Sequence, residues 1–175
     1  MAKKLNDPLL MAAKGIIYFI LGVLAFAGFF VLLGVPTTLF FGADLGADFN
    51  AADLPQHAYW LIALLLSAVA GLLYIGIRFF LYMLRIVQSV GAGDPFAPEN
   101  ADRLTAMAWI TLAINVLMLP VAALGIYVAK LAGEAPGTVD ADLDFGGIVL
   151  ILTLFILARV FKHGAAMRDD LEGTV

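Results

Sequence analysis

The sequence predicts an all-α integral membrane protein with four transmembrane helices. Of its 175 residues, 63% are hydrophobic and 14% are charged, whereas soluble domains are about half apolar and about a quarter charged. The apolar residues gather into four long runs that take up most of the chain. We therefore expect a single membrane domain, residues 1–175, and a function that resides in the helices and their loops.

Three of the apolar runs, 15–35, 58–77 and 104–129, contain no charged residue. Each is long enough to cross a hydrocarbon core, which takes about 20 residues. The second helix is expected to continue past Arg78 to about residue 84. The fourth run, 145–161, is short and contains Arg159, whose long side chain is expected to reach the interface.

The basic residues predict the orientation of these spans. Nine of the ten Lys and Arg residues lie before the first run, around the connection 88–103, or at the end of the chain. The connections 36–57 and 130–144 contain Lys130 and seven acidic residues: Asp44, Asp48, Asp53, Glu134, Asp140, Asp142 and Asp144. By the positive-inside rule, both termini, the 88–103 loop and the 162–175 tail are cytoplasmic, and two consecutive hairpins face two acidic outer loops.

Two features of the sequence allow alternatives to this plan. Ala25-Phe26-Ala27 is similar to a signal-peptide cleavage site, but it lies inside an uninterrupted apolar run, which favours a membrane span. Small residues recur along the second helix (Ala63, Ser67, Gly71) and along the first (Gly22, Ala25, Gly28). Such ridges let helices approach closely, and we expect packing within the bundle, with a homo-oligomer contact as the alternative.

The most polar segment between the spans is GDPFAPENADRL, residues 93–104. Asp94-Pro95 predicts a turn, because a residue before proline is disfavoured in helices. Pro98-Glu99 predicts a helix start, with Asn100 as an alternative cap. Phe96 lies between two prolines, where it either packs against the helix ends, dips into the interface or docks a partner.

A few polar residues fall within or beside the spans. Asn115 precedes Pro120, and we expect a kinked helix in which the amide helps the freed backbone, or else a polar cavity. Arg159 either reaches the headgroups or pairs with Glu99 or Asp102. Arg78 and Arg85 are expected to anchor their helix at the interface and, with Arg159 and Lys162, to contact anionic lipid headgroups.

No motif predicts catalysis, a cofactor or a specific metal site. The chain has no cysteine, and it contains no HExxH, GxSxG or phosphate-binding glycine loop. Asp140, Asp142 and Asp144 have the alternation of a calcium loop, but the glycine and the final glutamate are out of register. His57 and His163 are expected on opposite sides of the membrane. A weak cation site in the acidic outer loops remains the alternative to a plain acidic surface.

Two stretches are similar to a known family. GDPFAPENADRL before a membrane helix and the C-terminal LARVFKHGAAMRDDLEGTV resemble the bacterial DUF2975 family of small four-helix membrane proteins. The resemblance supports the four-span topology of a bacterial membrane protein, which we expect in the inner membrane. It also implies a cytoplasmic partner, because many such proteins are encoded beside a small Cro/CI-type helix-turn-helix regulator. It implies no catalytic residue.

The sequence thus favours a non-enzymatic membrane protein that contacts lipids and, through its cytoplasmic face, a partner protein, without binding nucleic acid directly. The candidate residues either bind this partner or hold the loop against the helix ends: Asp94, Phe96, Glu99, Asn100, Arg103, Phe161 and Gly164. The alternative is a small transporter, channel or membrane-stress immunity protein that acts on lipid, peptide or ion. Its candidate polar residues are Asn115, Arg78, Arg85 and Arg159.

Overall fold

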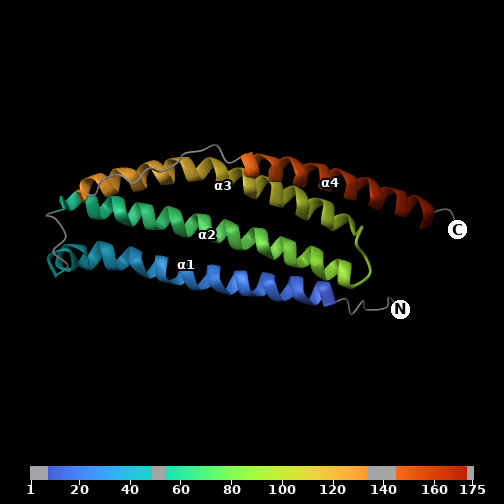
Figure 1. Ribbon diagram of the computed structural model, residues 1–175, viewed down its shortest axis with the longest axis horizontal. Coiled ribbons are helices and arrows are strands. Elements are labelled where there is room, and N and C mark those ends of the chain that lie inside the picture. Colours follow the sequence, from blue (N-terminus) through green and yellow to red (C-terminus); the bar gives the residue numbers. More distant parts are fainter. Residues whose placement is uncertain (1–7, 49–53, 134–144, 173–175) are drawn as a thin grey trace. The chain divides into compact units, whose positions relative to one another are not determined.

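Four long helices make up the protein. The computed structural model describes residues 8–48, 54–133 and 145–172, which contain α1 (Pro8–Asp48), α2 (Gln56–Gly91), α3 (Pro98–Leu131) and α4 (Phe145–Glu172) (Figure 1). Each helix contains a stretch long and apolar enough to cross a membrane. The prediction of an all-helical chain with four such helices is confirmed.

The helix α1 is longer than the predicted span 15–35. It continues through Pro36 to Asp48, so the connection expected at 36–57 begins only after residue 48. Proline removes a backbone donor and usually breaks a helix. Here the hydroxyl groups of Thr37 and Thr38 donate to the carbonyl oxygens of Leu33 and Gly34. These side-chain bonds give additional donors to carbonyl groups in the turn that precedes Pro36.

The other helices also extend beyond the predicted spans. The helix α2 ends at Gly91 and α3 begins at Pro98, so the loop expected at 88–103 is confined to residues 92–97. The helix α3 continues through Pro120 to Leu131. The helix α4 continues past 161 to Glu172, and most of the predicted tail 162–175 is therefore helical.

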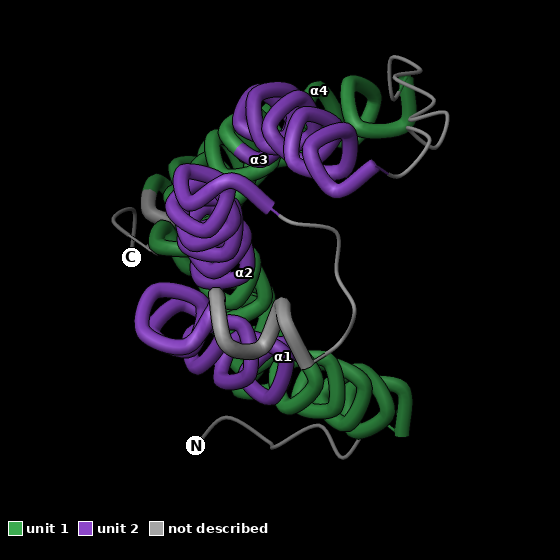
Figure 2. Tube along the Cα trace, turned by 90° about the vertical axis from the view of Figure 1, so that its left-hand side faces the viewer, with its two compact units in different colours: residues 1–23, 76–113, 144–175 green, residues 24–75, 114–143 purple. Residues whose placement is uncertain are grey.

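The chain divides into two compact units (Figure 2). Unit 1 contains residues 1–23, 76–113 and 144–175, and unit 2 contains residues 24–75 and 114–143. The helices α1, α2 and α3 contribute a segment to each unit, whereas the whole of α4 belongs to unit 1. The loop 92–97 also belongs to unit 1, so this unit contains most of the candidate residues.

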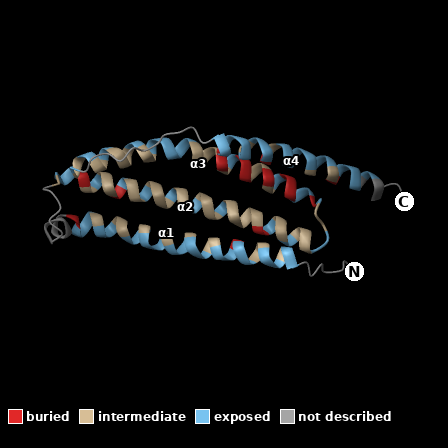
Figure 3. Cartoon of the chain, viewed as in Figure 1, coloured by how far each residue is buried: buried red, intermediate tan, exposed pale blue. Residues whose placement is uncertain are grey.

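Unit 1 has a compact core where α3 meets α4. The buried residues of this core are Leu104, Met107, Ala108, Leu154 and Ala158, and the residues packed against it include Phe79, Tyr82 and Met83 of α2. Figure 3 shows that buried positions gather in the first half of α3. The small side chains of Ala108 and Ala158 let the two helices approach closely, which is how helices pack where lipid supplies no hydrophobic incentive.

Unit 2 packs through glycines that the sequence analysis did not select. A Cβ on Gly34 would lie 3.1 Å from Cδ1 of Leu66, and one on Gly42 would lie 2.6 Å from Cδ1 of Tyr59. By contrast, a Cβ on Gly22, Gly28 or Gly71 would meet no atom within 4 Å. Those three glycines therefore do not serve as close contacts within the described chain, and a contact between copies stays a prediction.

Candidate functional site at the α2–α3 loop

The loop begins where α2 is stopped by Gly93. This glycine has a φ of +87°, a left-handed conformation that side-chain-bearing residues rarely adopt. Its N–H donates to the carbonyl of Val90, and the N–H of Asp94 donates to the carbonyl of Ser89, both at 3.0 Å. This pair of bonds is the Schellman motif, which satisfies the last carbonyls of a helix. The chain consequently leaves α2 in a fixed direction.

The next helix, α3, begins at Pro98 as the sequence predicts. Proline suits this position because the first helical N–H has no partner inside the helix. The N–H of Asn100 donates to the carbonyl of Ala97 at 2.8 Å, which makes Ala97 the residue that precedes the helix. Asn100 is therefore within the first turn, and its alternative assignment as the cap is wrong.

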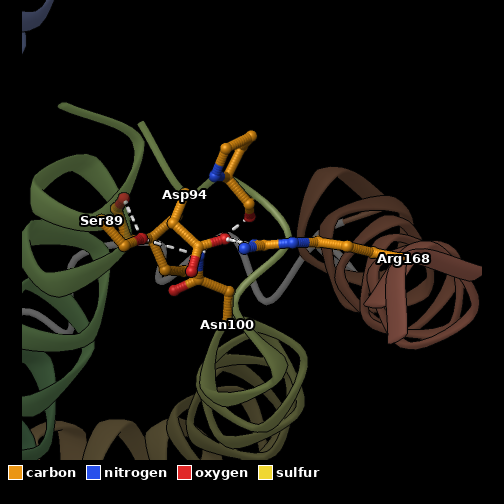
Figure 4. Close-up of polar contacts among 6 residues, drawn as sticks. Ser89, Asp94, Asn100 and Arg168 are labelled. Carbon is orange, nitrogen blue, oxygen red and sulfur yellow. Dashed lines mark hydrogen bonds and ion pairs between the residues drawn. The ribbon is translucent and has the colours of Figure 1, made fainter. Parts of the chain in front are cut away.

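The side chain of Asn100 joins the two helices and the loop. It is completely buried, with 0% of its surface exposed. Its Nδ2 donates to the hydroxyl of Ser89 at 2.7 Å and to the carbonyl of Pro95 at 3.0 Å, while its Oδ1 accepts from Nη1 of Arg103 at 2.7 Å (Figure 4). Buried amides are costly unless they are bonded. These three bonds therefore fix the end of α2, the loop and the start of α3 together.

Phe96 projects from the loop onto α4. Its ring lies 5.5 Å from the ring of Phe161, centroid to centroid, and it covers Gly164. A Cβ on Gly164 would come within 2.6 Å of Cδ1 of Phe96, a separation that atoms do not tolerate. Glycine is thus required at 164 for the ring to occupy this place. Phe96 nevertheless remains 41% exposed, so one part of the ring is available to solvent, lipid or another molecule.

An ion pair adds a second connection between the loop and α4. Nη1 of Arg168 lies 2.5 Å from Oδ1 of Asp94, and Figure 4 shows Arg168 reaching across from α4 toward Asp94. Both side chains are nearly half exposed. Exposed ion pairs contribute about 0–1 kcal/mol, so this pair orients the contact more than it stabilises it.

The salt bridge predicted for Arg159 is not formed among the described side chains. Arg159 lines a groove between α3 and α4 with Asp102 and Lys162, but no ion pair joins it to Asp102 or Glu99 in the described part of the chain. The ion pair between this loop and α4 is made by Arg168 instead, because that residue lies at the end of α4 that faces the loop.

Arg78 and Arg85 are not brought together with Arg159. Both guanidinium groups lie over the ring of Tyr82, at 5.6 and 5.9 Å from its centroid, and Nη2 of Arg78 also donates to the Tyr82 hydroxyl at 3.0 Å. These contacts fix the two arginines on α2. The lining of the α3–α4 groove does not include them.

The remaining candidates are spread more widely. Glu99 is exposed in the first turn of α3, and Asn115 is half-buried in the part of α3 that belongs to unit 2. Within the described ranges, no three His, Asp or Glu residues are placed to hold a metal ion. The cation site considered for the acidic outer loops involves Asp53, Asp140, Asp142, Asp144 and the side chains of Asp44 and Asp48, which lie outside the described residues.

The comparison with protein families agrees with the resemblance in the sequence. A family model described as "Protein of unknown function (DUF2975)" matches residues 45–175, three quarters of the chain. The chain belongs to the DUF2975 family. The matched region of this DUF2975 protein contains α2, α3, α4 and every residue of the loop contact with α4, whereas most of α1 precedes it. No curated protein and no solved structure matches the chain.

We predict that Asn100→Ala destabilises the DUF2975 protein by about 2 kcal/mol, because it removes three hydrogen bonds and leaves buried partners unsatisfied. The neighbouring Glu99→Ala is the matched control, since Glu99 is exposed and should change stability by less than about 0.5 kcal/mol. The measurement is reversible unfolding of both variants in detergent micelles. Equal stabilities for the two variants would contradict the role assigned to Asn100.

Proposed function

We propose that this DUF2975 protein is a non-enzymatic protein of the bacterial cytoplasmic membrane that presents one ordered surface to a cytoplasmic protein. The surface consists of the loop 92–97, the first turn of α3 and the end of α4. The observation that supports it is the contact of Phe96 with Gly164 and Phe161, which joins two segments more than sixty residues apart in the sequence.

A preorganised surface is suited to binding because little conformational entropy remains to be lost when a partner arrives. The loop is held by Asn100 and by the Schellman motif, while Glu99, Asp102 and part of Phe96 remain exposed. An exposed aromatic ring with acidic neighbours offers a partner one apolar anchor and charges that orient it. The resemblance to the DUF2975 family makes a helix-turn-helix regulator the first candidate.

The orientation required by this proposal has both termini and the loop 92–97 in the cytoplasm. It is supported by the distribution of basic residues, nine of which flank the spans on the proposed cytoplasmic side. It also makes the chain two consecutive hairpins, with the acidic connections after α1 and after α3 on the outer side.

The orientation predicts which introduced cysteines react from outside the cell. The natural chain has no cysteine, so single cysteines at the exposed positions Gln56 and Glu99 give clean signals. With a membrane-impermeant maleimide and intact spheroplasts, we expect Gln56→Cys to be labelled and Glu99→Cys to be labelled only after lysis. Labelling of Glu99→Cys in intact spheroplasts would contradict the orientation.

The partner is tested by photo-crosslinking from position 99 in living cells. Position 99 is preferable to position 96, since a probe at 96 would replace the ring that packs against Gly164 and Phe161. We expect capture of one specific cytoplasmic protein from position 99 and its loss when Phe96→Ala is added. The matched control is a probe at Met118, which is exposed in unit 2 and expected in lipid.

Two crosslinking results would contradict this proposal. Identical adducts from positions 99 and 118, or only lipid and the protein's own helices from position 99, would contradict a partner surface. The loop would then only hold the helix ends together. The alternative function, transport or membrane protection that involves Asn115, would become the better explanation.

A further inference from the structure

A groove between α3 and α4 has the chemistry of a lipid headgroup site. Its lining comes from the start of α3 and from the middle of α4: Ala101, Asp102, Thr105, Phe155, Ala158, Arg159, Lys162 and His163. All of these residues belong to unit 1. They include three basic side chains, one carboxylate and an apolar floor.

The polarity of the groove changes along α4. Phe155 and Ala158 form its apolar end, and Lys162 and His163 form its basic end. His163 lies eight positions after Phe155, which corresponds to about 12 Å along a helix. Lys162 and His163 lie three and four positions after Arg159, so both are neighbours of Arg159 on the helix surface. A phospholipid has the same order over a similar length, from acyl chain through glycerol to phosphate.

The donors and acceptors are also separated across the groove. Arg159 and Lys162 on α4 supply only donors, and neither is paired with Asp102 among the described side chains. On α3, Asp102 supplies a carboxylate, and the Thr105 hydroxyl donates to the carbonyl of Ala101 at 2.9 Å, which leaves its oxygen as an acceptor. The ring of His163 is oriented by a 3.1 Å contact between Nδ1 and the Arg159 carbonyl.

We propose that this groove binds the headgroup of an anionic phospholipid that bears hydroxyl groups, such as phosphatidylglycerol. The phosphodiester accepts from Arg159 and Lys162, the headgroup hydroxyls donate to Asp102, and an acyl chain follows Phe155 and Ala158. Two fixed positive charges opposite one carboxylate leave a net positive site, which matches a headgroup with one negative charge.

The apolar floor favours a lipid over free phosphate. Phe155 and Ala158 follow the uncharged residues 145–154 of α4, in a helix that is apolar enough to span a membrane, whereas the basic residues come after them. We therefore expect the apolar end of the groove to lie nearer the hydrocarbon than the basic end. A soluble phosphate would gain nothing from these side chains. The arginines of α2 are less suited to the same role, because Tyr82 already holds both guanidinium groups.

The test measures lipid binding by the purified full-length protein in detergent, using native mass spectrometry with added phosphatidylglycerol. We expect the variant Arg159→Gln with Lys162→Gln to bind roughly tenfold to thirtyfold more weakly, since each basic residue contributes about a tenfold or smaller factor. The matched control, Lys14→Gln with Lys130→Gln, removes the same charge at positions that do not line the groove and should bind as the natural protein does. Unfolding curves of both variants verify that they remain folded.

Other lipids test the details of the site. Phosphatidylcholine with the same acyl chains should bind more weakly than phosphatidylglycerol, and Asp102→Ala should lower the preference for phosphatidylglycerol over phosphatidic acid. An excess of inorganic phosphate should not displace the lipid. The proposal is overturned if the groove variant and the control variant lose binding equally. It is also overturned if phosphatidylcholine binds as tightly as phosphatidylglycerol, or if inorganic phosphate displaces the lipid.

Discussion

The arrangement of the loop depends on one buried amide. Asn100 is completely buried at the start of a helix that is otherwise expected to enter lipid, and each of its polar atoms has a partner. Because an unbonded amide there would cost about 1–3 kcal/mol, the loop has little freedom to move away from Ser89 and Pro95. Phe96 and Asp94 therefore point toward α4 as a consequence of bonds made on the other side of the loop.

The contact between the loop and α4 is dominated by the aromatic ring. A packed pair of aromatic rings contributes about 0.5–1.5 kcal/mol beyond the burial of its surface, and Gly164 allows the Phe96 ring to approach the backbone of α4 closely. The ion pair between Asp94 and Arg168 is exposed and adds less. The same end of α4 also supplies Arg159 and Lys162 to the groove, so the proposed protein and lipid sites lie on the same two helices, α3 and α4, and share Asp102.

The helices and the start of α3 could be predicted because they depend on local properties. Long apolar runs and Pro98 act within a few residues of sequence. The length of α1 could not be predicted from Pro36, because proline usually ends a helix, whereas α1 continues through it. Gly93 was part of the quoted segment, and a glycine before Asp-Pro is the signal that could have revealed the Schellman motif.

Packing partners were harder to predict. The spacing of small residues selected Gly22, Gly28 and Gly71, whereas the close approaches occur at Gly34, Gly42 and Gly164. Spacing shows which face of a helix carries small side chains, but only the fold shows which face contacts a neighbouring helix. The role of Asn100 was missed for the same reason. In the sequence it resembled a helix cap, and only the fold shows that Ser89 of α2 lies within hydrogen-bond distance of its side chain. The sequence did select Phe96 of the loop and Phe161 and Gly164 of α4, although not how they touch. It missed Ser89 and Arg168, whose contacts with Asn100 and Asp94 depend on the fold.

Hydrogen exchange of Gly164→Ala tests most directly whether the loop and the end of α4 behave as one unit. The added methyl group would displace Phe96, and we expect faster amide exchange both in residues 92–100 and in residues 161–168. The control Gly71→Ala adds the same methyl group where no atom lies within 4 Å and should leave both segments unchanged. Unchanged exchange in both segments of Gly164→Ala, or faster exchange in only one of them, would contradict the coupling.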